Sequence, residues 1–143
     1  MKKFLSVFLA IALIFALTLS LASCFNTVDA EGVWENAEYR RDMTFGEGDT
    51  TFTLIVEVGE NSVKFTINTD RTILADALLD YGLIGGENGA YGLSVYTVNG
   101  MEVNFTRDNT YWALYIGEDY AMTGVSYIEI ENGREYKFVY SRA

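Results

Sequence analysis

The chain has 143 residues, with 20 Asp and Glu against 10 Lys and Arg, a formal net charge of −10, one Cys, no His and no Pro. Without His and with a single Cys, most nucleophilic triads and nearly all zinc, haem and iron–sulfur sites are excluded. Nucleic-acid binding is disfavoured because it needs clustered cations. We therefore expect a single folded, acidic domain that is not an enzyme and needs no cofactor or metal.

The N-terminal residues have the pattern of an export signal. Lys2 and Lys3 precede an apolar run over residues 4–21, as in a secretory signal peptide. The run ends in Leu-Ala-Ser-Cys, which resembles the bacterial lipobox, in which the Cys becomes the lipidated first residue. We predict a lipoprotein signal peptide over residues 1–23 and lipidation at Cys24; the alternative is an uncleaved membrane helix. The 120 remaining residues would carry a charge of −12 and be extracytoplasmic, anchored to the membrane by acyl chains.

Residues 24–50 contain few periodic apolar positions. Phe25 to about Gly32 is polar and patternless, which predicts a short tether. The next segment, 34–45, is ambiguous, and we place a candidate edge strand near residues 37–41. Gly46-Glu47-Gly48-Asp49 predicts a turn.

The clearest periodicity begins at residue 51. Alternating apolar residues over 52–58 and 63–67 predict two strands joined by a turn, hence an antiparallel hairpin. A helix should follow, with Thr72 as its N-cap and Gly82 in the left-handed position after its C-terminus. The glycine-rich stretch 85–89 predicts a flexible loop.

Further strands are predicted over 91–98, 110–116, 126–131 and 135–141, with tight turns at Asn99-Gly100 and Asn132-Gly133. A hairpin, one helix and then several strands indicate an α+β fold, with the helix packed across a mixed sheet. This order of elements is compatible with a β-grasp.

Several sequence features together resemble a known family. They are Thr72–Leu78, Gly89–Leu93, the Tyr111-Trp112 pair that opens a strand, Gly124, and the turn at Asn132-Gly133. In this order they resemble bacterial extracytoplasmic domains related to the C-terminal domain of transcobalamin and intrinsic factor. The resemblance covers residues 52 to 140 and places a domain of this type at 51–143.

The resemblance implies a β-grasp-like fold that holds a small ligand, such as a corrinoid or another planar, hydrophobic molecule. In the vitamin carriers the corresponding segments cover one face of cobalamin. The ligand-binding residues it implies here are Tyr91, Gly92, Leu93, Trp112, Leu114 and Tyr115. The implied function is non-catalytic binding of the ligand at the cell surface, where it feeds an uptake system.

The strand 111–116 is apolar on both sides, with Tyr111 and Tyr115 on one and Trp112 and Leu114 on the other. One interpretation is a central strand covered on both faces, by the helix and by segment 34–45. The other is an exposed aromatic patch, extended by Tyr91, Tyr96 and Tyr120, which would bind either a ligand or a surface protein or glycan. The carboxylates at 118–119 and at 129 and 131 lack calcium-loop spacing and are expected to be solvated.

Overall fold

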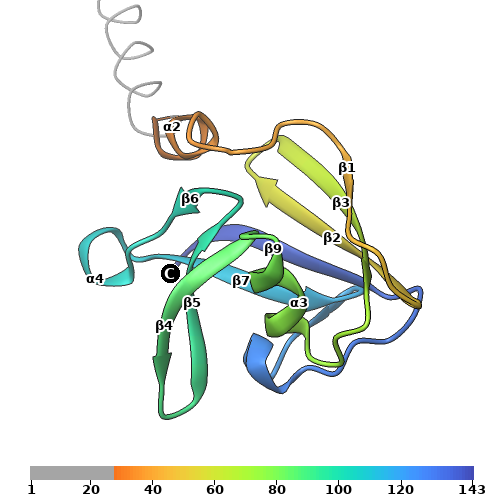
Figure 1. Ribbon diagram of the computed structural model, residues 1–143. Helices are drawn as coiled ribbons and strands as arrows, with labels where there is room; N and C mark the ends of the chain where they lie inside the picture. The colour runs from red at the N-terminus through yellow and green to blue at the C-terminus, as the bar shows by residue number, and fades with distance from the viewer. Residues whose placement is uncertain (1–27) are drawn as a thin grey trace, which may run out of the picture.

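The computed structural model describes residues 28–143, so the predicted signal peptide and Cys24 lie outside the described residues. The described part is an α+β structure with far more residues in strands than in helices, as the sequence predicted (Figure 1). None of the helices between residues 28 and 143 has the length and apolar character needed to cross a membrane.

The larger sheet has six strands in the order β1-β3-β2-β9-β7-β8. Hairpin β2–β3 is antiparallel, β2 and β9 are parallel at the centre, and β7 is antiparallel to β9. A hairpin, a helix and two further strands, with the first and last strands parallel in the middle, is β-grasp topology. The strands are β1 (Met43–Phe45), β2 (Thr50–Val58), β3 (Asn61–Thr69), β7 (Thr110–Ile116), β8 (Asp119–Tyr120) and β9 (Glu135–Arg142).

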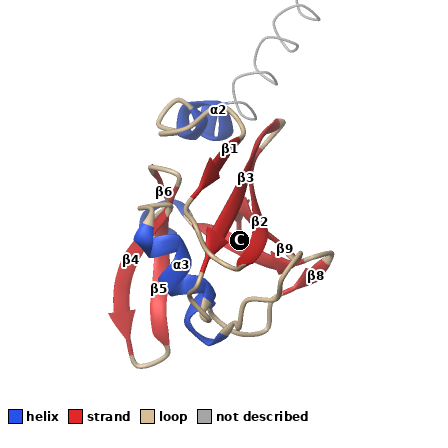
Figure 2. Ribbon diagram, turned by 45° about the vertical axis from the view of Figure 1, so that its right-hand side comes forward, coloured by secondary structure: helices blue, strands red, loops and turns tan. Residues whose placement is uncertain are grey.

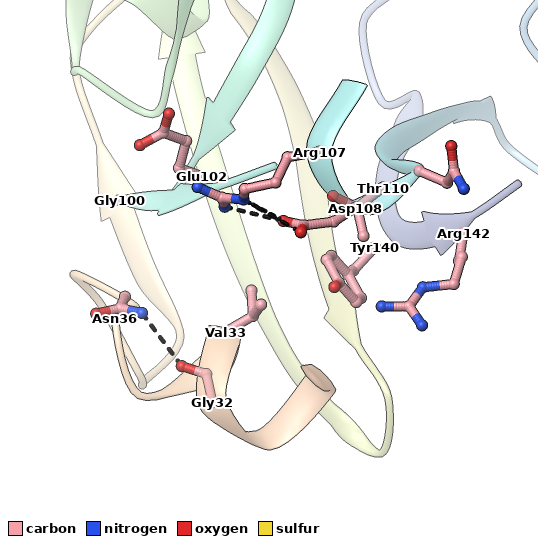
Figure 3. Close-up of a pocket in the computed structure, with 11 residues that line it drawn as sticks. Gly32, Val33, Asn36, Gly100, Glu102, Arg107, Asp108, Thr110, Tyr140 and Arg142 are labelled. Atoms are coloured by element: carbon pink, nitrogen blue, oxygen red, sulfur yellow. Dashed lines mark hydrogen bonds and ion pairs between the residues drawn. The ribbon is translucent and has the colours of Figure 1, made fainter. Parts of the chain in front are cut away.

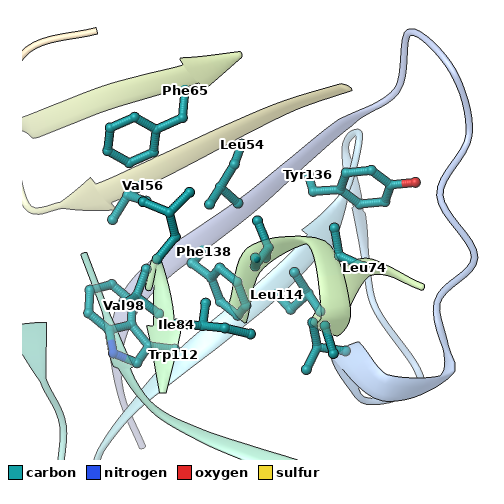
Figure 4. Close-up of a cluster of buried hydrophobic side chains, with 14 of the residues drawn as sticks. Leu54, Val56, Phe65, Leu74, Ile84, Val98, Trp112, Leu114, Tyr136 and Phe138 are labelled. Carbon is teal, nitrogen blue, oxygen red and sulfur yellow. The ribbon is translucent and has the colours of Figure 1, made fainter. Parts of the chain in front are cut away.

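The core lies between this sheet and helix α3 (Leu74–Asp80). Alternate residues of β2, from Phe52 to Val58, are buried, which confirms the predicted period of two. Leu74 and Leu78 of α3 are fully buried, and Figure 4 shows Leu74 near Leu114 and Phe138. The N-cap of the helix is Ile73 rather than the predicted Thr72. The carbonyl of Thr72 instead accepts a hydrogen bond from Ile130 N.

A second, three-stranded sheet is inserted after α3. It comprises β4 (Ile84–Gly89), β5 (Gly92–Val98) and β6 (Met101–Glu102), and α3 lies between its β4–β5 hairpin and β2–β3 (Figure 2). The prediction of a flexible loop at 85–89 was wrong, because β5 pairs with this stretch along its length and a bulge at Gly85/Gly86 accommodates the glycines. The tight turn at Asn99-Gly100 is confirmed by φ angles of 50° and 78°.

The N-terminal described residues are more ordered than the sequence predicted. Val28–Trp34 forms helix α2 where a tether was expected, and Val33 and Trp34 pack against the core. The edge strand is β1, not residues 37–41. The reason is that the Asn99 side chain accepts a hydrogen bond from Tyr39 N at 2.9 Å and donates one to Tyr39 O at 2.8 Å. Both backbone groups of Tyr39 are thus unavailable to a neighbouring strand.

Two C-terminal segments also differ from expectation. The predicted strand 126–131 is instead a 3₁₀ helix, η1 (Val125–Tyr127), followed by one isolated bridge between Ile73 and Glu129. An unpredicted short helix, α4 (Phe105–Asp108), precedes β7, and the Asn104 side chain caps it by accepting from Arg107 N at 2.9 Å. Strand β9 and the turn at Asn132-Gly133 are as predicted.

Candidate ligand-binding site

Strand β7 is buried along its core-facing side, and on its opposite face only Ala113 is buried. Trp112 and Leu114 are 7 % and 9 % exposed and face the core, whereas Tyr111 and Tyr115 lie half-buried on the opposite face. Segment 34–45 does not cover that opposite face; its strand β1 lies at the far edge of the sheet, next to β3. The interpretation of a strand covered on both faces is therefore wrong for Tyr111 and Tyr115, and the tryptophan is not part of an exposed patch.

The core-facing side of β7 forms the floor of a cavity of about 370 Å³, here called the Trp112 cavity. Its walls come from β5, β7, β9 and the loop 120–125 that crosses toward η1. This volume lies within the range that small-molecule sites occupy. The lining residues are Leu93, Val95, Trp112, Leu114, Tyr120, Ala121, Met122, Thr123, Gly124, Val125 and Phe138.

The structure brings together three of the six residues that the resemblance implied. Leu93, Trp112 and Leu114 line the Trp112 cavity. Tyr91 is 89 % exposed at the β4–β5 turn, and its carbonyl lies beside Gly124. Gly92 follows it with a φ of 87°, and Leu93 N donates to Ser126 Oγ at 2.9 Å, which fixes this hairpin against η1.

Tyr115 does not reach the Trp112 cavity. On the other face of the sheet, its ring lies edge-on to the ring of Tyr120, with 5.6 Å between the ring centroids. The Lys137 ammonium lies 5.9 Å from the centroid of the Tyr115 ring. Sequence reasoning had named Tyr120 and Gly124 but missed Phe138 and residues 121–123. Phe138 is placed opposite Leu114 by the β7–β9 register, which no local pattern reveals.

The Trp112 side chain has one chemically notable atom. Its Nε1 is buried and donates to no protein group among the described residues. The ring packs edge-on against Tyr140 at a centroid distance of 6.0 Å. A buried donor without an acceptor costs about 1–3 kcal/mol, so a ligand acceptor within its reach would be favoured.

A larger cavity of about 870 Å³ is polar. It lies between α2, the β5–β6 turn, α4 and the end of β9, and Figure 3 shows Arg107 bonded to Asp108 at its centre. The two groups are 2.8 Å apart. The hydrogen bond from Arg107 lowers the pKa of Asp108, so this pair stabilises the fold above the ordinary carboxyl pKa and loses that effect as the pH falls through the lowered value. The pair is solvent-exposed, so the contribution is small.

Across residues 28–143 no group of three His, Cys, Asp or Glu side chains is placed to hold an ion. Glu129 and Glu131 are exposed, and Glu131 pairs with Arg134 at 3.5 Å.

Neither a protein-family model nor a curated protein matches the sequence. Solved structures do match. One is a candidate metal-binding protein from Ruminococcus gnavus, with a TM-score of 0.63 and 22 % identity over 66 % of this chain and 99 % of that one. Another is haptocorrin in complex with Cbi, with a TM-score of 0.51 and 20 % identity over 68 % of this chain and 26 % of haptocorrin. What the three share is the fold. The described domain thus corresponds to about a quarter of the haptocorrin chain.

Proposed function

We propose that this protein binds a small, ring-bearing, largely apolar molecule in the Trp112 cavity and does not transform it. The observation that carries the proposal is the cavity itself: most of the residues that line it are apolar, none is charged, and the ring of Trp112 lies on its floor. Corrinoids are the first class to test, because the fold is shared with haptocorrin in complex with Cbi. The cavity is too small to enclose a corrin ring, so such a ligand would cover its mouth.

The proposal predicts that Thr123→Trp removes ligand binding. Thr123 is exposed at the cavity wall, so a bulky ring there fills the space while leaving the core intact. We expect wild-type protein to shift the absorbance of cobinamide and to raise the fluorescence of dansylamide, an apolar ring probe. Thr123→Trp should weaken both by at least about tenfold, equivalent to about 1.4 kcal/mol.

Tyr111→Ala is the matched control, because Tyr111 lies on the same strand but on the opposite face. It should leave both affinities unchanged. Equal binding by wild type and Thr123→Trp would place the ligand elsewhere. A null result with cobinamide but a positive one with dansylamide would exclude corrinoids and retain the site.

We also propose that the protein is attached to the outside of a bacterial membrane through acyl chains on Cys24. The support is the lipobox-like sequence, and two or more acyl chains suffice for stable anchoring. Cys24→Ala should move the protein from the membrane fraction to the soluble fraction and abolish incorporation of radiolabelled palmitate. Wild-type protein that is soluble and unlabelled would disprove the anchor.

A second candidate function is a surface that binds a protein or glycan. Tyr91 and Met122 are 89 % and 91 % exposed, and Tyr127 is 60 % exposed close to Gly92, so large side chains gather around the cavity mouth. In this case Tyr91→Ser should abolish a cross-linked adduct in intact cells, whereas Thr123→Trp should preserve it. The opposite pattern would favour the small-ligand function.

A further inference from the structure

A second cavity continues the Trp112 cavity along the same two strands. Its volume is about 400 Å³, and we call it the Glu129 cavity. Thr123 lines both cavities and separates them. The remaining wall of the Glu129 cavity comes from η1 and from the segment that leads to the Asn132-Gly133 turn.

The register of β7 and β9 shows how close the two cavities are. Leu114 pairs with Phe138 on the floor of the Trp112 cavity, and Ile116 pairs with Tyr136 on the floor of the Glu129 cavity. These are successive core-facing pairs, separated by two residues and therefore by about 7 Å along the strands. An extended molecule of modest length can reach from one floor to the other beside Thr123.

The two cavities differ in chemistry. No charged residue lines the Trp112 cavity, whereas Glu129, Glu131 and Arg134 line the Glu129 cavity. Arg134 neutralises Glu131 at 3.5 Å, but the Glu129 carboxylate has no hydrogen bond or ion pair within the part of the chain that the structure describes. The backbone at Glu129 is held in place, because Tyr136 Oη donates to its carbonyl and accepts from Glu131 N. One unpaired carboxylate is thus attached to an ordered stretch of backbone beside the Glu129 cavity.

We propose that the two cavities form one site for an elongated amphipathic cation, with its ring in the Trp112 cavity and its ammonium group beside Glu129. This inference rests on the proposed function and adds the ligand's length and charge. Because Glu129 is exposed, the charge preference is modest and falls with salt. Most of the affinity comes from the ring and the alkyl chain.

Three dansyl probes separate these contributions. Dansylamide has the ring alone, dansylcadaverine adds an alkyl tail with a terminal ammonium, and N-acetyl-dansylcadaverine has the same tail without the charge. At low ionic strength we expect both tailed probes to bind more tightly than dansylamide, and the ammonium to bind about two- to fivefold more tightly than its acetylated form. Glu129→Gln should remove that preference and leave dansylamide affinity unchanged. Glu60→Gln, the same charge change at the distant β2–β3 turn, should preserve it.

The outcomes distinguish this inference from the proposed function. Equal affinity for all three probes overturns the extended site but leaves the Trp112 cavity as the binding site. An ammonium preference that survives Glu129→Gln overturns the role of Glu129. If Thr123→Trp binds all the probes as wild type does, both proposals fail. If none of the dansyl probes binds, the extended site is overturned, and the proposed function fails as well unless cobinamide binds.

Discussion

Gly86→Ala is expected to destabilise the protein by at least about 3 kcal/mol. A Cβ at this position would lie 1.7 Å from the carbonyl oxygen of Ser94 and 2.8 Å from its carbon. These are backbone atoms of the paired strand β5, so no side-chain rotation relieves the clash, and the β4–β5 hairpin must move. The hairpin carries Leu93 and Val95 into the Trp112 cavity, so dansylamide affinity should fall as well.

Gly85→Ala provides the control one residue earlier. The nearest atom to its Cβ would be Thr97 Cβ at 3.7 Å, an ordinary contact. Its stability should remain within about 1 kcal/mol of wild type. Urea denaturation followed by tryptophan fluorescence measures both variants. Equal stability for the two would show that the close approach of β4 to β5 at Gly86 is not a constraint on the fold.

Asn99→Ala is expected to cost about 3 kcal/mol and to release the segment that precedes β1. Asn99 is fully buried, and removing its side chain leaves Tyr39 N and Tyr39 O without their partners. Alanine must also adopt a φ of 50°, which costs about 1–2 kcal/mol relative to a right-handed conformation. The readout is urea denaturation combined with hydrogen exchange at the Tyr39 amide.

Asn99→Gly separates the two contributions. Glycine adopts the positive φ readily but also lacks the side-chain hydrogen bonds. It should therefore be more stable than Asn99→Ala by about 1 kcal/mol, while the Tyr39 amide exchanges rapidly in both variants. A Tyr39 amide that stays protected in Asn99→Gly would mean that the apolar contacts and the backbone hydrogen bond from Glu38 N to Asn99 O are enough to hold the N-terminal segment.

Local periodicity was sufficient for β2, β3, β7 and β9 of the main sheet but not for the N-terminal segment. The alternation of apolar and polar residues around Phe52 determines a strand, and the Asn99-Gly100 dipeptide determines a tight turn. In both cases the signal lies within a few residues. The loss of a strand at 37–41 depends on Asn99, whose partner Tyr39 is 60 positions away. The glycines of β4 have low intrinsic strand propensity, so the sequence predicted a loop there. They are ordered by pairing with β5, and intrinsic propensity contains no information on that pairing.

The residues of the candidate site were also predictable only in part. Leu93, Trp112 and Leu114 were found through a family resemblance, and they do line one cavity. Phe138 was missed because its place opposite Leu114 depends on the pairing of two distant strands. Thr123 has no pattern around it, and only the path of the loop shows that it borders two cavities.

The central position of β9 determines when the domain can form. This strand is the last element of the chain, yet it lies between β2 and β7. Until residues 135–142 have emerged from the ribosome, the hairpin β2–β3 and strand β7 have no common partner, and each presents an unpaired edge. Folding of this domain therefore waits until β9 has been synthesised, and a product that lacks β9 has two unpaired strand edges that favour aggregation.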